Sequence, residues 1–265
     1  MKKYLSILLT LIIGVSLIGC ASNAQDRGTT QSKVIVGEDK AITDEMKEYY
    51  TVGEIIEFEE NAVHVLTGDI AEVFKVDKHS MTDFYLGETV GVVKLGEDSY
   101  KLDRYKIKDF SIRHTNMGQI IETIEGTVKS VDKQFFEINT KDGVMKFNAY
   151  KDIYLEIGEK ITVEYLEFGD QKGLVQFYNE DSKIDLVVKG INRLDETGIM
   201  KVNTVDSNGN EYKVYVLGST VLNFNHSDLK VEDKITVYPE VIREIYPAEI
   251  DPKKIVLIKE EVKIQ

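Results

Sequence analysis

The amino-acid sequence predicts a mainly β protein in which three small five-stranded barrels follow a secretory signal and a polar spacer. One seven-residue phrase recurs three times, as Leu86–Val92, Ile157–Val163 and Val231–Val237. Around each copy, runs that alternate apolar and polar residues are separated by turns rich in Gly, Asp and Asn. This is the pattern of short strands joined by hairpins. Only 3 prolines occur in the 265 residues, so a long rigid stalk is not expected.

The N-terminus has the pattern of a secretory signal. A charged start, Met1–Lys3, precedes an apolar run from Tyr4 to Gly19. The run is short for a membrane-spanning helix, which needs about 20 apolar residues. It ends in Leu17-Ile18-Gly19-Cys20, and Cys20 is the only cysteine of the chain. A single cysteine excludes an internal disulfide, so each domain must be held together by its core.

The residues Leu17, Ile18, Gly19 and Cys20 resemble the lipobox of bacterial lipoproteins. The resemblance implies that residues 1–19 are removed as a signal peptide and that Cys20 is acylated, for example with palmitate. Each buried methylene contributes about 0.8 kcal/mol, so two or three acyl chains form a firm anchor. We therefore expect a lipid-anchored protein on the extracytoplasmic face of the cell membrane. The alternative is an ordinary signal whose cysteine is incidental.

Residues 20–45 are predicted to be the lipidated N-terminus and a flexible spacer, because Ala21–Thr30 is small and polar. Three modules follow, with predicted bounds 46–115, 116–183 and 184–265. Each begins with a strand that carries a glycine, namely Gly53, Gly126 or Gly190.

Two further strands are predicted in each module before the recurring phrase. They are Ala62–Leu66 and Ala71–Val76, then Phe135–Asn139 and Val144–Phe147, then Ile199–Asn203 and Glu211–Val216. Asp142-Gly143 and Asn208-Gly209 supply residues that accept the positive φ of tight hairpins.

The recurring phrase is predicted to make a turn that leads into the fourth strand of each module. Gly87 and Gly158 are matched by Glu232, and a turn conformation is their expected role. A short irregular segment precedes each phrase, and a fifth strand closes each module. The segments are Asp77–Tyr85, Asn148–Leu155 and Leu217–Leu229, and the closing strands are Tyr100–Ile107, Leu174–Tyr178 and Ile255–Ile258.

Five strands with a short segment between the third and the fourth resemble an OB-type barrel. Closure is reasonable because short strands with two open edges invite aggregation. An SH3-like barrel or a small sandwich remains an alternative for each module. The resemblance concerns the fold type and names no family for the mature chain.

The composition makes nucleic acid an improbable partner. Without residues 1–19 the chain carries 31 basic and 46 acidic side chains, a net charge of −15. Affinity for phosphate backbones comes mainly from Lys and Arg. A basic envelope protein or a cell-wall glycan suits this surface better.

No motif for catalysis or metal binding is convincing. His64, His79, His114 and His226 are not at close ligand spacing, so no metal site is predicted. The loop from Asp206 to Glu211 lacks the acidic twelfth residue of a calcium loop and is expected to be a hairpin turn. Ser227–Lys230 reads S-x-x-K without its companion motifs. We predict no catalytic residue, no metal and no cofactor.

Aromatic residues gather near predicted strands, and core packing is their expected role. They are Tyr100 and Tyr105, Phe147 and Tyr150, and Tyr212 and Tyr215. Exposed aromatics on the face of strands 2 and 3 of an OB barrel would instead stack on flat ligands.

The sequence as a whole predicts a non-enzymatic lipoprotein that binds a protein, a peptide or a cell-wall glycan of the envelope. No residue of the ligand-binding site can be named from the sequence. One alternative is a structural spacer or assembly lipoprotein, and another is an envelope hydrolase or metal-binding lipoprotein.

Overall fold

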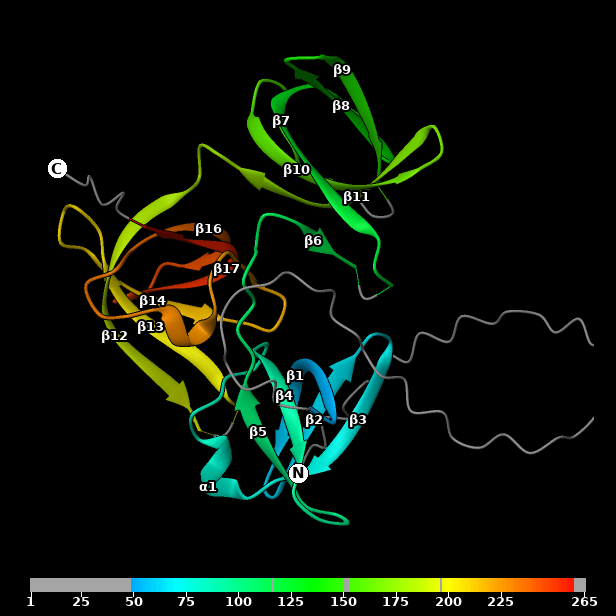
Figure 1. Ribbon diagram of the computed structural model, residues 1–265. Coiled ribbons are helices and arrows are strands. Elements are labelled where there is room, and N and C mark those ends of the chain that lie inside the picture. Colours follow the sequence, from blue (N-terminus) through cyan, green and yellow to red (C-terminus); the bar gives the residue numbers. More distant parts are fainter. Residues whose placement is uncertain (1–48, 116, 150–152, 196, 260–265) are drawn as a thin grey trace, which may run out of the picture. The chain divides into compact units, whose positions relative to one another are not determined.

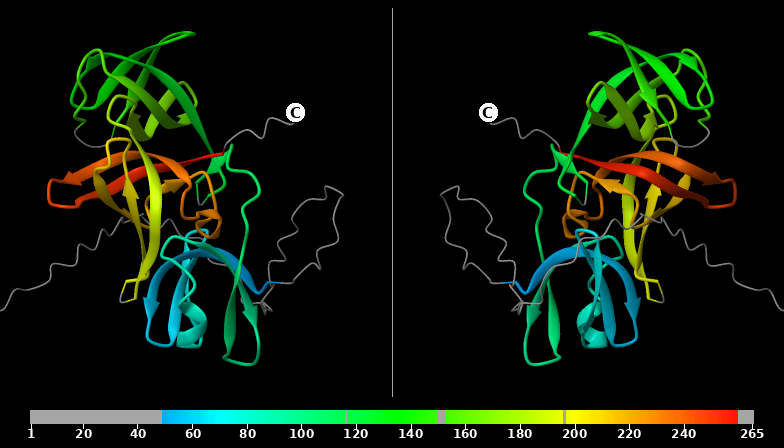
Figure 2. Two further views of the ribbon diagram at one scale, coloured as in Figure 1. Left: turned by 90° about the vertical axis from the view of Figure 1, so that its left-hand side faces the viewer. Right: turned by 90° about the vertical axis from the view of Figure 1, so that its right-hand side faces the viewer.

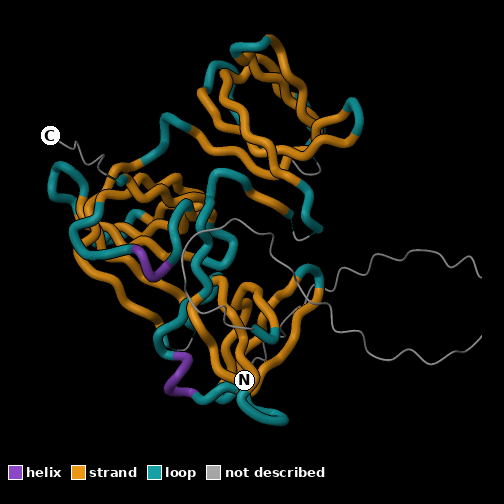
Figure 3. Tube along the Cα trace, in the orientation of Figure 1, coloured by secondary structure: helices purple, strands orange, loops and turns teal. Residues whose placement is uncertain are grey.

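The computed structural model describes residues 49–115, 117–149, 153–195 and 197–259, and these residues are mainly β (Figure 1). Their strands form three sheets, and each sheet closes into a small barrel of five strands. The predicted fold class is therefore confirmed. In this part of the chain, helix is confined to two short segments, which Figure 3 colours purple. The signal and the spacer lie outside the described residues.

Barrel 1 has the strand order of an OB barrel. Its elements are β1 (Thr51–Glu59), β2 (Ala62–Thr67), β3 (Ile70–Lys75), α1 (Lys78–Met81), β4 (Thr89–Lys94) and β5 (Tyr100–Arg104). The sheet runs β3-β2-β1-β4-β5. A parallel bridge between Val76 and Tyr100 joins the end of β3 to β5 and closes the barrel. The predicted segment between the third and fourth strands contains α1.

Barrel 2 repeats this order with one addition. Its strands are β6 (Arg113–His114), β7 (Ile120–Val131), β8 (Phe135–Thr140), β9 (Gly143–Asn148), β10 (Lys160–Phe168) and β11 (Gln171–Asn179). β7 pairs with both β8 and β10, and β11 meets β9 in parallel. The added strand β6 pairs with β7. The sequence analysis assigned residues 113–114 to the first module, but the structure joins them to this second sheet.

Barrel 3 closes in the same way, through a parallel contact between its third and fifth strands. Its elements are β12 (Ile184–Leu194), β13 (Ile199–Val205), β14 (Glu211–Val216), β15 (Val221–Leu222), η1 (His226–Asp228), β16 (Lys234–Arg243) and β17 (Ala248–Ile258). The β16–β17 hairpin, orange to red in Figure 2, is longer than its counterpart in barrel 1.

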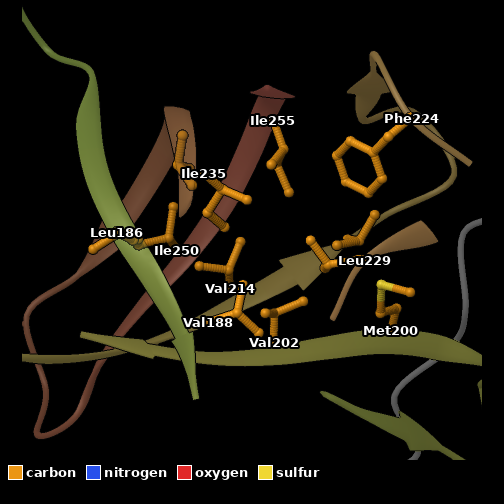
Figure 4. Packing of buried hydrophobic residues seen from close by; sticks show 12 residues of the cluster. Leu186, Val188, Met200, Val202, Val214, Phe224, Leu229, Ile235, Ile250 and Ile255 are labelled. Atoms are coloured by element: carbon orange, nitrogen blue, oxygen red, sulfur yellow. The ribbon is translucent and has the colours of Figure 1, made fainter. Parts of the chain in front are cut away.

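Each barrel has a core of its own, which follows from the alternation of its strands. In β13, for example, Met200, Val202 and Thr204 are buried and the residues between them are not. In barrel 3 the side chains of Met200 and Val202 meet Val214, Ile235 and others in one apolar cluster (Figure 4). Separate clusters fill barrels 1 and 2. Three small closed cores account for the repeated apolar alternation in the sequence.

The recurring phrase forms the same tight turn in all three barrels. Its second residue has a positive φ, which is 82° at Gly87, 97° at Gly158 and 74° at Glu232. A backbone N–H three residues beyond the start of the turn donates back to the first carbonyl, as a type II turn requires. The acidic third residue of the phrase also accepts a hydrogen bond from the first N–H of the turn. These acceptors are Glu88 (3.1 Å), Glu159 (2.9 Å) and Asp233 (2.7 Å).

The turn is fastened to the first strand of its barrel. The Gly87 N–H donates to the Ile55 carbonyl at 2.8 Å, and the Ile55 N–H donates to the backbone carbonyl of Glu88 at 3.0 Å. The corresponding first-strand residues, Val128 and Val188, make the same pair of hydrogen bonds. The strand bulges immediately after each of these three residues. The phrase recurs because each barrel uses it to join its fourth strand to its first.

This fastening corrects the glycine alignment made from the sequence. Gly53 and Gly126 precede the fastened residue by two positions, but Gly190 follows Val188 by two. A Cβ atom at Gly53 would lie 2.4 Å from the Leu66 carbonyl oxygen, and one at Gly126 would lie 2.7 Å from that of Asn139. Gly190 has no such backbone contact, so its resemblance to the other two is coincidental.

Barrel 1 contacts barrel 3 directly, although barrel 2 separates them in the sequence. The Leu86 N–H donates to the Gly198 carbonyl at 2.8 Å. The Arg193 guanidinium donates to the carbonyls of Met81 and Phe84 and lies 4.1 Å from the ring of Phe58. These contacts join the α1 segment and the β1–β2 turn of barrel 1 to the β12–β13 turn of barrel 3.

A second point of contact lies just before barrel 2. The Asn225 amide accepts from the Ile107 N–H at 2.8 Å and donates to the Ile107 carbonyl at 3.2 Å. Lys106 and Asp228 form an ion pair at 3.5 Å beside it. The chain leaving barrel 1 is thus held along barrel 3.

Candidate binding cleft

The first barrel has a shallow, open cleft of about 580 Å³ at one of its ends. The β1–β2 turn, the end of β3 and the β4–β5 loop surround it. OB barrels bind their ligands beside these connections, between strands 1 and 2 and between strands 4 and 5. The cleft is lined by Glu59, Glu60, Asn61, Ala62, Lys75, Val76, Asp77, Asp98 and Ser99. Its position makes it the candidate functional site.

Local backbone interactions hold the walls of the cleft. The Val76 N–H donates to the Asn61 carbonyl at 3.1 Å, which fixes the β1–β2 turn against the end of β3. The Asp77 carboxylate accepts from the His79 N–H at 2.9 Å and begins α1. Ala62 and Val76 are buried and form the apolar floor. Backbone hydrogen bonds therefore fix the walls of the cleft, and its acidic side chains lie around an apolar floor.

The electrostatic potential of the cleft is negative. Four carboxylates, those of Glu59, Glu60, Asp77 and Asp98, face one ammonium, that of Lys75. The Lys75–Asp98 pair is 4.0 Å apart and both side chains are well exposed, so it neutralises little of the field. A cleft lined by one sign of charge concentrates ions of the other sign. This one suits Lys or Arg side chains of a partner.

The adjoining face of β2 and β3 offers aliphatic rather than aromatic surface. His64 lies opposite Val73 in the sheet, and the Val73 side chain is 57% exposed. The His64 Nε2 is 2.8 Å from the Glu59 carboxylate, which connects this face to the cleft. The only aromatic residue of the two strands, Phe74, is buried. Stacking on nucleobases requires exposed aromatic rings, so this face has no platform for them.

No group of three His, Cys, Asp or Glu residues in the described part of the chain could hold a metal ion, and this includes the cleft. The carboxylates of the cleft can attract a cationic group as separate point charges. They do not converge as metal ligands do.

Of the described aromatic residues singled out from the sequence, Phe147 packs in a core as expected, whereas Tyr100, Tyr105, Tyr212 and Tyr215 are only half-buried. Phe147 is fully buried and stacks on Phe136. Tyr100 packs edge-on against Phe74 at 5.1 Å. Tyr105 meets another ring, and the hydroxyls of Tyr212 and Tyr215 hydrogen bond to carboxylates. Tyr150 lies outside the described residues.

The loop from Asp206 is a hairpin turn, as predicted. The Asp206 carboxylate accepts from the Asn210 side chain and from the N–H groups of Asn208 and Asn210, all at 2.8 Å. These hydrogen bonds lower the pKa of the Asp206 carboxyl group, and the one from the Asn210 side chain has the largest effect. The carboxylate is therefore occupied within its own turn. Ser227 of the S-x-x-K pattern lies in η1.

Two titratable residues were not singled out as functional by the sequence analysis and lie where barrel 1 meets barrel 3. His226 is buried and stacks on Tyr85, and its Nε2 has no hydrogen-bond partner among the described residues. Burial, with a smaller contribution from Arg104, lowers the pKa of His226 to about 4. Burial also raises the pKa of Glu54, whose carboxylate lies beside Gly218, to about 7.

The cleft residues were also missed. Their only sequence signal is that Glu59-Glu60-Asn61 and Glu97-Asp98-Ser99 are both turn-forming and acidic. Cys20 and the lipobox residues Leu17, Ile18 and Gly19 lie outside the described residues. None of the described helices is long and apolar enough to cross a membrane.

No family model matches the chain, and no curated protein matches it. Solved structures with a similar arrangement include a multidomain protein with nucleic acid binding domains from Streptococcus pneumoniae TIGR4. It is 11% identical, with 78% of this chain and 71% of that chain covered and a TM-score of 0.19. Another is Drosophila Unr CSD456, 8% identical, with 80% and 97% covered and a TM-score of 0.22. Likeness at this level carries no functional argument, so the OB-like assignment rests on the strand order.

Proposed function

We propose that the protein is a non-enzymatic lipoprotein, anchored through Cys20 on the extracytoplasmic face of the membrane, that binds a basic partner of the envelope. The acid-lined cleft of barrel 1 is the observation that carries the proposal. It combines a fixed frame, an apolar floor and an excess of carboxylates at the place where OB barrels bind ligands. The partner is a protein or peptide segment that inserts Lys or Arg.

The net charge of the whole chain supports the same partner. A value of −13 attracts basic proteins at long range and repels phosphate backbones. A neutral cell-wall glycan would gain nothing from this field, so a basic segment fits better. Nucleic acid does not suit the cleft.

The proposal is tested by capture from an envelope extract at low and high salt, with the chain from Ala24 onward immobilised. The cleft variant Glu60→Lys/Asp98→Lys changes the charge by +4. The control Asp142→Lys/Asp170→Lys makes the same change in two hairpin turns of barrel 2. We expect a salt-sensitive partner that the cleft variant loses and the control retains. Equal capture by both variants would contradict a role for the cleft.

A second candidate function, a structural spacer, is favoured by one observation. Barrels 1 and 3 are joined by Arg193 and by the Asn225–Ile107 pair, and such fixed junctions suit a protein that keeps something at a set distance. Capture of no partner at either salt would favour this function over the first.

A further inference from the structure

The fourth strand of barrel 3 extends beyond the strand that pairs with it. β12 covers β16 only from Lys234 to Val237. The following residues, Tyr238–Arg243, pair with β17 alone among the described strands. In an antiparallel sheet alternate residues direct their N–H and C=O groups to each side. The far side of this stretch therefore presents unpaired backbone groups, as an edge strand does.

Only the inner part of this edge is protected. Pro239 lacks an N–H, and the pairing is irregular there because Glu240 bulges out of register with β17. Proline and bulges are the devices that prevent unwanted strand pairing. Val241, Ile242 and Arg243 beyond the bulge are in regular register with β17. The outer three residues thus form a regular edge, in which the Arg243 carbonyl already accepts from the Ile245 N–H at 2.9 Å.

The end of this hairpin is apolar on its surface. Val241 is 45% exposed and Ile242 is 44% exposed. In the turn that follows, Ile245 is 55% exposed and Tyr246 is 86% exposed. Tyrosine is enriched among the residues that contribute most to binding at protein interfaces. The open edge and the apolar side chains lie on the same element.

In barrel 2 the first strand extends further along the fourth strand, but only as far as the positions that correspond to Tyr238 and Pro239. There the first strand, β7, continues past the equivalent point, so that Thr123 and Glu122 pair with Glu164 and Tyr165 of β10. Arg113 of β6 donates to the buried carboxylate of Glu164. An extended segment accompanied by a guanidinium thus covers the acidic fourth strand of barrel 2.

The charges around the open edge of barrel 3 suit a cationic strand. Glu240 and Glu244 are exposed, and neither takes part in an ion pair within the described part of the chain. Arg243, the nearby cation, is occupied by Asp251 and Glu249. A second copy of this acidic chain would bring like charges together, whereas a strand with Lys or Arg would complement them.

We propose that the β16 edge from Val241 to Arg243, together with Ile245 and Tyr246, accepts an extended segment of a partner protein as an additional antiparallel strand. The segment carries aliphatic residues and Lys or Arg. Main-chain hydrogen bonds supply affinity in this mode, and the side chains supply specificity. The surface is separate from the barrel 1 cleft and does not depend on that site.

A peptide probe tests the main-chain component. The peptide copies residues 120–126 with Glu122 and Glu125 replaced by lysine, because this aliphatic segment already pairs as a strand with β10 in barrel 2. The matched control has the same side chains but N-methyl groups on alternate peptide nitrogens. Amide hydrogen exchange is measured on the full chain in detergent. We expect the first peptide, and not the second, to slow exchange in residues 241–246 by about tenfold or more.

Two variants assign the binding surface. Val241→Lys/Ile242→Lys is expected to weaken peptide binding at least about tenfold, because it removes apolar surface and places positive charge beside a cationic peptide. Unchanged exchange protection in residues 250–256 verifies that the variant is folded. The cleft variant Glu60→Lys/Asp98→Lys is expected to bind the peptide as the unmodified chain does. This separates failure of the edge from failure of the cleft.

Three results would overturn the inference. The first is no protection of residues 241–246 at millimolar peptide, and the second is equal protection by the N-methylated peptide. The third is sedimentation of the chain alone as a dimer that Val241→Lys/Ile242→Lys dissociates, because the occupant would then be a second copy.

Discussion

At the scale of single residues, the third copy of the recurring phrase carries a strained position. Glu232 has a φ of 74°, whereas the other two copies have glycine at this point. A side chain in this region costs about 1 kcal/mol, of which the greater freedom of glycine in the unfolded chain offsets a part. We expect Glu232→Gly to raise the free energy of unfolding by up to about 1 kcal/mol in urea titration.

Gly158→Ala is the matched control for that substitution. A Cβ atom there meets nothing within 4 Å, so any effect comes from the φ of 97° alone. We expect a loss of about 1–2 kcal/mol. Effects of the same sign for the two variants would show that backbone strain is not what distinguishes the copies.

His226 gives stability a dependence on acid pH. Its folded pKa of about 4 lies below the ordinary value of 6.5, chiefly because the ring is buried. The neutral ring therefore contributes stability fully above pH 6.5, and this is lost as the pH falls through 4. His226→Phe retains a ring against Tyr85 but cannot be protonated. Unfolding followed from pH 7 to 4 should show a smaller loss for the variant.

Glu54 gives the opposite dependence. Burial raises its pKa from 4.5 to about 7, so its contribution is fully present below pH 4.5 and is lost as the pH rises through 7. Glu54→Gln removes this titration. Relative to the unmodified chain, the variant should gain stability between pH 5 and 8. A stability difference that is constant across this range would contradict a buried, neutral Glu54.

At the scale of elements, two asparagines of barrel 3 make the same clamp on different partners. Asn225 holds the backbone of Ile107, just before barrel 2, whereas Asn223 holds that of Leu257 within barrel 3. Each substitution by alanine should cost about 1–3 kcal/mol, because buried backbone groups lose their partners. Hydrogen exchange should accelerate at Ile107 only in Asn225→Ala. Acceleration there in Asn223→Ala as well would mean that the clamp does not act locally.

Most strands could be predicted from the sequence because local alternation and turn residues determine them. The predicted strand Glu211–Val216 coincides with β14. The first half of β17 was missed, since Pro252 interrupts the pattern and pairing with β14 and β16 decides the outcome. β6 was missed because two residues give no periodic signal. Strands that depend on distant partners are therefore the ones that local sequence cannot reveal.

At the scale of the whole molecule, the sequence predicts three modules but not the contacts between them. Arg193 and Asn225 give no sign in the sequence that barrel 1 contacts barrel 3. The same limit applies to the cleft, whose acidic residues come from three connections that only the closed barrel brings together. Net charge was the sequence property that predicted a basic partner.

Limited proteolysis tests both the modules and the contact. We expect cleavage near residues 108–112 and 180–183 to give fragments of roughly 60–80 residues, in line with small-domain sizes. The fragments of barrels 1 and 3 should elute together in gel filtration. A single resistant core would contradict separate modules, and three separate fragments would contradict the contact.

The clamp at Ile107 has a consequence for how the molecule can change. The chain reaches barrel 2 from a point held on barrel 3, and it leaves barrel 2 directly into β12 of barrel 3. Barrel 2 is thus an insertion whose two ends both adjoin barrel 3. Tyr178 of barrel 2 packs against Tyr238 of barrel 3, with 5.6 Å between the ring centroids, so a replacement for barrel 2 would have to keep this contact, while the contacts between barrels 1 and 3 would remain. The middle barrel is therefore where the protein has most freedom to acquire a different surface without rebuilding the rest.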